Sequence, residues 1–187
     1  MKEGSKFGRR DFMRVAVTAA AGGAAWMAIH PGGQTMVWQL DPAKCQQCGR
    51  CATTCVLNPS AVKCVHSYQI CGYCDLCGAY LQPSAKSRDT GAENELCPVG
   101  ALKRTFVEEP FYQYTIDEAL CVGCGKCVKG CNTFGNGSLY LQVKRDVCVG
   151  CNECSIARNC PAEAFRQIPV PTAYLLKTHH GGSEHTS

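Results

Sequence analysis

Residues 45–55 have the sequence CQQCGRCATTC, in which cysteines follow one another at two-residue gaps and then at a three-residue gap. The same spacing, or a close variant of it, recurs three times further along the chain. The four runs contain sixteen of the seventeen cysteines of this 187-residue sequence: Cys45, Cys48, Cys51 and Cys55; Cys71, Cys74, Cys77 and Cys97; Cys121, Cys124, Cys127 and Cys131; Cys148, Cys151, Cys154 and Cys160. Such a cysteine content is typical of disulfide scaffolds and of metal proteins rather than of ordinary globular domains.

The spacing favours metal binding over a disulfide framework. Thiolates at two-residue gaps converge on one point, whereas a disulfide between them would be strained. An odd number of cysteines also cannot pair completely. Zinc sites use Cys-x2-Cys pairs too, but they usually take four ligands from two separated pairs. Three cysteines at two-residue gaps with a distant Cys-Pro, as at Cys97-Pro98 and Cys160-Pro161, therefore predict iron-sulfur clusters.

An internal repeat relates the two halves of the cysteine-rich region. A shift of 76 residues superimposes the first run on the third, and a shift of 77 residues superimposes the second run on the fourth. The runs resemble those of bacterial ferredoxins, in which three cysteines wrap one 4Fe-4S cluster and a fourth binds the cluster of the partner run. This predicts an α+β fold of two tandem ferredoxin-like modules, residues 36–110 and 111–170, each with two clusters.

The ferredoxin rule, applied to adjacent runs within each module, assigns the ligands of four 4Fe-4S clusters. The predicted sets are Cys45, Cys48, Cys51 and Cys97; Cys55, Cys71, Cys74 and Cys77; Cys121, Cys124, Cys127 and Cys160; Cys131, Cys148, Cys151 and Cys154. Short strands and helices are expected around the clusters, which would take the place of a conventional core.

Cys64 is the one cysteine outside the runs. It lies seven residues before Cys71, as Leu141 lies seven residues before Cys148. Apolar and polar residues alternate around Leu141, which predicts a half-buried strand over residues 138–143. A second strand is expected over residues 102–107. Cys64 is therefore expected at an inward strand position, where a cysteine behaves as a small apolar side chain.

Residues 1–35 have the features of an export signal. Arg9 and Arg10 stand directly before Asp11-Phe12, and the uncharged apolar run of residues 15–29 follows. This pattern resembles a twin-arginine signal and predicts export of the folded protein to the periplasm. The apolar run is too short to span a bilayer comfortably, although if it is retained it would hold the protein at the membrane. Export after folding agrees with the prediction of iron-sulfur clusters, because these are assembled in the cytoplasm.

The charge balance limits the partners that we expect. Basic and acidic residues nearly balance from residue 31 onward, so most of the positive excess lies in the N-terminal region. Each oxidised cluster with its thiolates adds about two negative charges. Nucleic acid is therefore disfavoured as a partner, and docking on a basic patch of a redox protein is expected. Residues 82–95 are expected to form a polar surface loop and residues 171–187 a flexible tail.

The signal and the cysteine runs together are similar to those of twin-arginine-exported polyferredoxins of respiratory oxidoreductases. This resemblance implies an electron-transfer protein without catalysis of its own, which relays electrons between a membrane-bound or quinol-linked partner and a periplasmic redox enzyme. It also implies a second way to pair the runs, because in several such subunits the first and fourth runs share a module. The sequence also allows an integral iron-sulfur subunit of a multi-subunit oxidoreductase, or a zinc-binding module. A stand-alone oxidoreductase is disfavoured, since the sequence contains neither a haem motif nor a nucleotide-binding fingerprint.

Overall fold

The computed structural model describes residues 35–68, 70–71, 77–87 and 94–175. Several sequence-based predictions concern residues outside these ranges: the twin-arginine signal up to residue 34, the ligand Cys74, the middle of the loop over residues 82–95 and the end of the C-terminal tail. Within the described ranges, no helix is both long enough and apolar enough to cross a bilayer.

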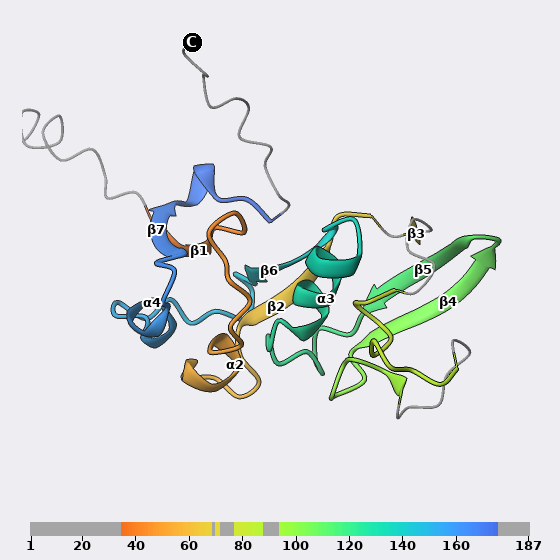
Figure 1. Cartoon of the computed structure of the whole chain (residues 1–187). Helices are drawn as coiled ribbons and strands as arrows, with labels where there is room; N and C mark the ends of the chain where they lie inside the picture. The colour runs from red at the N-terminus through yellow and green to blue at the C-terminus, as the bar shows by residue number, and fades with distance from the viewer. Residues whose placement is uncertain (1–34, 69, 72–76, 88–93, 176–187) are drawn as a thin grey trace, which may run out of the picture. The chain divides into compact units, whose positions relative to one another are not determined.

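The described residues form three small antiparallel sheets and several short helices (Figure 1). In chain order the elements are β1 Met36–Leu40, α2 Cys51–Thr54, β2 Val62–His66, β3 Ile70–Cys71, β4 Leu102–Glu108, β5 Phe111–Ile116, α3 Lys126–Phe134, β6 Leu139–Val143, α4 Ser155–Asn159, β7 Phe165–Pro169 and the 3-10 helix η2 Val170–Thr172. The strands predicted over residues 102–107 and 138–143 are confirmed as β4 and β6, but β6 is buried on both faces and not half-buried as predicted.

Two of the sheets join parts of the chain that are far apart in the sequence. β1 pairs with β7, so that Leu40 lies opposite Phe165. β2 pairs with β6, and Cys64 lies opposite Leu141, its counterpart in the repeat. The third sheet has the strand order β3-β5-β4 and contains the β4–β5 hairpin (Figure 1).

This strand pairing differs from the predicted division into two consecutive modules. The predicted boundary between residues 110 and 111 falls at the turn of the β4–β5 hairpin, and Met36–Ser187 forms one compact unit. The physical reason is that β1 and β2 take their hydrogen-bond partners from β7 and β6, beyond the predicted boundary. The repeat in the sequence is therefore not a division of the chain into separate folded parts.

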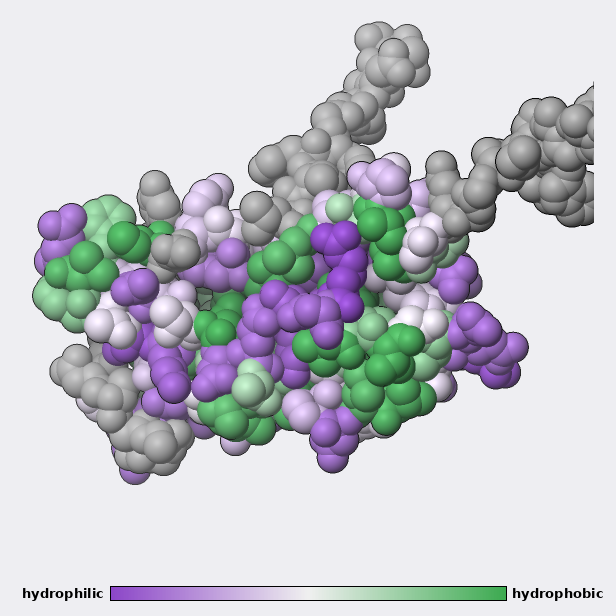
Figure 2. All heavy atoms as spheres, turned by 180° about the vertical axis from the view of Figure 1, so that it is seen from behind, coloured by the Kyte–Doolittle hydropathy of each residue, from purple (hydrophilic) through white to green (hydrophobic). Residues whose placement is uncertain are grey.

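The core is small and contains cysteines among its apolar side chains. Its buried members include Leu40, Val62, Leu81, Val128, Leu141, Cys51, Cys64, Cys121, Cys127 and Cys131. On the face shown in Figure 2, apolar residues are interspersed with polar ones. Cysteines thus occupy positions that larger apolar side chains fill in an ordinary core.

Candidate functional site

Four cysteine side chains from two distant runs line one cavity. Cys55 ends the first run, and Cys148, Cys151 and Cys154 belong to the fourth; together they face a cavity of about 30 Å³ whose other walls are mostly apolar. Burial raises the pKa of Cys148, and Cys55 is among the neighbouring thiols whose negative charge raises it further. Trp38 of β1, which also lines the cavity, donates a hydrogen bond from Nε1 to the carbonyl of Cys151 at 2.6 Å. β1 therefore holds the fourth run against the end of the first.

The other three cysteines of the first run lie beside Cys160. Burial raises the pKa of Cys51 to about 12, and the thiols of Cys45, Cys48 and Cys160 contribute to the rise when they are ionised. Burial also raises the pKa of Cys45, where Cys160 is again a charged neighbour. Four thiols therefore converge at this place, and because thiolates repel one another, they need positive charge between them in order to ionise together.

Cys71 and Cys77 of the second run lie beside Cys131, which ends the third run. The three line a cavity of about 10 Å³, together with Tyr114 of β5. Burial raises the pKa of Cys77, while a hydrogen bond from the Tyr114 hydroxyl lowers it. Cys74, the remaining cysteine of the second run, lies outside the described residues.

The third run packs against β2. The backbone N–H of Cys64 donates to Sγ of Cys121 at 3.4 Å, and Sγ of Cys64 lies 3.4 Å from Sγ of Cys127. The hydrogen bond between these thiols, together with burial, raises the pKa of Cys64, and the same bond lowers the pKa of Cys127. Cys64 is 4% exposed and lies in β2, which confirms its predicted inward strand position.

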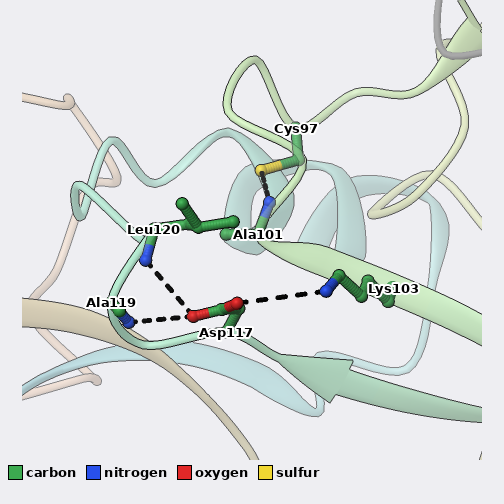
Figure 3. Close-up of polar contacts among 6 residues, drawn as sticks. All are labelled: Cys97, Ala101, Lys103, Asp117, Ala119 and Leu120. Carbon is green, nitrogen blue, oxygen red and sulfur yellow. Dashed lines mark hydrogen bonds and ion pairs between the residues drawn. The ribbon is translucent and has the colours of Figure 1, made fainter.

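Cys97 has the same local geometry as Cys160. Sγ of Cys97 accepts a hydrogen bond from the backbone N–H of Ala101 at 3.3 Å, and Sγ of Cys160 accepts one from Ala164 at 3.4 Å. Each sulfur thus receives the N–H of the residue four positions later, as Figure 3 shows for Cys97 and Ala101. The two Cys-Pro segments are therefore structural equivalents.

An aspartate before the first and third runs ties each run to one of these Cys-Pro segments. The backbone N–H of Asp41 donates to the carbonyl of Ala164 at 2.8 Å, and that of Asp117 donates to the carbonyl of Ala101 at 2.7 Å. The Asp117 carboxylate also accepts hydrogen bonds from two following backbone N–H groups (Figure 3). The first run therefore begins beside the Cys160 segment, and the third begins beside the Cys97 segment.

These contacts differ from the predicted pairing of adjacent runs. The structure brings Cys160, and not Cys97, to the first three cysteines of the first run. It brings Cys55 to the fourth run, and Cys131 to the second. Contacts of this kind are the ones expected of the nested alternative, in which the first run shares a module with the fourth. The reason is the strand pairing. The first run lies between β1 and β2, the fourth lies between β6 and β7, and the β1–β7 and β2–β6 pairs join these flanking strands.

The sequence-based predictions did not include three polar residues that hold the cysteine runs: Asn136, Asp41 and Asp117. Asn136 donates from Nδ2 to Sγ of Cys71 at 3.3 Å. Asp41 and Asp117 do carry a signal, since the 76-residue shift that superimposes the first and third runs also superimposes these two residues. Asn136 carries none, because its contact with Cys71 arises from tertiary packing across 65 residues.

The donor groups at these places fit iron-sulfur clusters. All sixteen described cysteines are free thiols, and backbone N–H groups point at several of their sulfurs. Hydrogen bonds of this kind hold cluster ligands in ferredoxins. Among the described residues, no group of three or more His, Cys, Asp or Glu side chains is placed to hold a single metal ion. That observation concerns mononuclear sites, whereas a 4Fe-4S cluster spreads its thiolates over four irons.

No family model matches the chain, and no solved structure matches it.

Proposed function

We propose that this protein is an electron-transfer protein that carries four 4Fe-4S clusters. It relays electrons between a membrane-bound or quinol-linked partner and a periplasmic redox enzyme, after export by the twin-arginine route, and catalysis lies with those partners. The observation that carries the proposal is the apolar cavity that Cys55, Cys148, Cys151 and Cys154 line together. A 4Fe-4S cluster supplies one-electron chemistry at a potential set by hydrogen bonds, charge and exposure.

The contacts between runs support ligand sets of the nested kind. The proposed sets are Cys45, Cys48, Cys51 and Cys160; Cys55, Cys148, Cys151 and Cys154; Cys71, Cys74, Cys77 and Cys131; Cys97, Cys121, Cys124 and Cys127. The set that contains Cys97 is supported by its equivalence to Cys160 and by the Asp117 contact to Ala101.

The protein's own groups have two tasks in this proposal. Backbone N–H groups such as those of Ala101 and Ala164 donate to the Cys97 and Cys160 sulfurs, which stabilises negative charge there. Burial excludes water and raises the pKa of Cys51 to about 12, so the metal-free thiol keeps its proton at neutral pH. Loading the site therefore releases protons, because only the thiolate binds metal.

The test is elemental analysis of protein purified without oxygen. We expect a brown protein with about sixteen iron and sixteen sulfide per chain, as four 4Fe-4S clusters require. The Cys151→Ser variant should lose or alter one cluster in electron paramagnetic resonance (EPR) spectra. The Ser155→Ala variant is the matched control, because Ser155 lines the same cavity and the change should leave all four clusters intact. A colourless protein that contains zinc would contradict the proposal.

A further inference from the structure

Lys63 is a buried lysine in the middle of β2. It is 2% exposed, and among the described residues no other buried side chain carries a charge. Burying an ammonium group is costly unless a negative charge and hydrogen-bond acceptors surround it. The position therefore requires a negative partner.

The described residues offer Lys63 no carboxylate. Its Nζ donates a hydrogen bond to the carbonyl of Cys121 at 2.6 Å, which is a neutral acceptor. The three ion pairs among these residues join Lys103 to Asp117, Lys144 to Glu118 and Arg158 to Glu153, and none includes Lys63. An ammonium group has three donors, and the carbonyl takes only one of them.

The residue opposite Lys63 does not supply the missing acceptor. Gln142 of β6 pairs with Lys63 in the register and is fully buried. Its Oε1 already accepts hydrogen bonds from the backbone N–H groups of Leu40 and Val143, at 3.2 and 3.1 Å. Because a carbonyl oxygen has two lone pairs, no acceptor remains on Gln142 for Lys63.

The acceptor that the structure gives the ammonium belongs instead to the third run. Two consecutive residues of β2 hold Cys121: Lys63 binds its carbonyl oxygen at 2.6 Å, and the N–H of Cys64 binds its Sγ at 3.4 Å. The contacts of Lys63 and of the next residue in β2 therefore point to Cys121, and to the cluster proposed to lie on its thiolate, as the negative partner.

We propose that Lys63 is the internal counter-charge of the cluster held by Cys97, Cys121, Cys124 and Cys127, and that it raises the reduction potential of that cluster. This inference rests on the proposed function. Reduction adds one negative charge to a cluster, so a fixed cation nearby stabilises the reduced form more than the oxidised form. The effect is large in a buried place, because little solvent screens the charge.

The test is an EPR-monitored redox titration of the loaded protein and of its Lys63→Met variant. Removing the charge should lower one of the four midpoint potentials. We expect the equilibrium constant of one-electron reduction to fall tenfold or more, which is a shift of about 59 mV or more for one electron. Lys86→Met is the matched control, since it removes a positive charge from an exposed loop and should leave all four potentials unchanged.

Two further variants decide the remaining outcomes. Lys63→Arg keeps the charge and should keep the wild-type potential, whereas Lys63→Gln should behave like Lys63→Met. If the uncharged variants lose iron, we expect Lys63→Arg to retain it, because the cluster then depends on the charge itself. Unchanged potentials in fully loaded Lys63→Met or Lys63→Gln protein, or loss of iron in all three variants, would overturn the inference. A wild-type protein without clusters would instead refute the proposed function.

Discussion

The indole of Trp38 and the carbonyl of Cys151 are joined by a hydrogen bond of 2.6 Å across 113 residues of chain. Through this bond the first strand touches the fourth cysteine run, and the pairing of β1 with β7 holds the same two regions together. Cysteines of the first and fourth runs should therefore depend on one another for cluster binding. This dependence should be stronger than that between cysteines of neighbouring runs.

This dependence predicts which pairs of cysteine substitutions act on one cluster. In the nested arrangement Cys48 and Cys160 bind the same cluster, so the Cys48→Ala/Cys160→Ala variant should lose about four iron per chain, the content of one 4Fe-4S cluster. The Cys48→Ala/Cys97→Ala variant should affect two clusters and lose about eight iron. Iron analysis and the number of altered EPR signals measure the difference.

The two double variants serve as controls for each other, because each removes two thiols and the first substitution is shared. If adjacent runs pair instead, the two results exchange places. That exchange would restore the arrangement predicted from the repeat.

Cys64 should be dispensable for cluster binding although its sulfur lies 3.4 Å from that of Cys127. It lies buried in β2, where its pKa is raised by the contact with Cys127 and by burial, and the third run has its own cysteines. The Cys64→Ser variant should keep the wild-type iron and sulfide content, whereas Cys127→Ser should lose or alter one cluster. A loss of about four iron from Cys64→Ser protein would make Cys64 a ligand of a 4Fe-4S cluster.

Gly123 and Gly150 occupy the same position in two Cys-Val-Gly-Cys segments, yet they should differ in tolerance to alanine. Both have positive φ, 74° and 65°, which costs a residue with a side chain about 1–2 kcal/mol. A Cβ on Gly123 would lie 2.4 Å from the Val62 carbonyl oxygen, whereas a Cβ on Gly150 would meet no atom within 4 Å. Gly123→Ala should therefore lower the free energy of unfolding more than Gly150→Ala does.

The two variants are compared with their clusters bound. Their thermal unfolding is monitored by circular dichroism. The Gly150→Ala variant measures the cost of the positive backbone angle alone. The difference between the unfolding midpoints of the two variants therefore measures the steric clash of the new Cβ at position 123 with Val62 of β2. Equal midpoints would show that the third run does not press against Val62.

The arginine pair of the predicted signal should be needed for export. The Arg9→Lys/Arg10→Lys variant keeps the positive charge but removes the feature that a twin-arginine translocase recognises. We expect the precursor to remain in the cytoplasm, as measured by cell fractionation and immunoblotting. Arg14→Lys is the control and should be exported normally. Periplasmic accumulation of the doubly substituted protein would exclude the twin-arginine route.

Local patterns in the sequence predicted local structure well. Alternation of apolar and polar residues located β6, and the repeat placed Cys64 at a buried strand position equivalent to that of Leu141. Both inferences depend on neighbouring residues, because the direction of a side chain in a strand follows from its position along that strand.

The pairing of the runs could not be predicted in the same way. The 76-residue shift relates Asp41 to Asp117, and each aspartate binds the carbonyl that follows a Cys-Pro segment. The two segments share the cysteine, the proline and the alanine four residues after the cysteine, so sequence similarity does not say which one each aspartate takes. The choice is made by β1–β7 pairing, in which Met36 meets Pro169, and no local pattern encodes that register.

The pairing of β1 with β7 also sets the order of events during synthesis. β1 is among the first described segments to leave the ribosome, but its strand partner ends at Pro169. Contacts of such long sequence separation form late, since the intervening chain must first be made and its loop closed. In the ligand set proposed above, the cluster site around Cys45 therefore stays incomplete until Cys160 has been translated. A nascent or truncated chain lacks that place, so maturation of the first run is coupled to completion of the polypeptide.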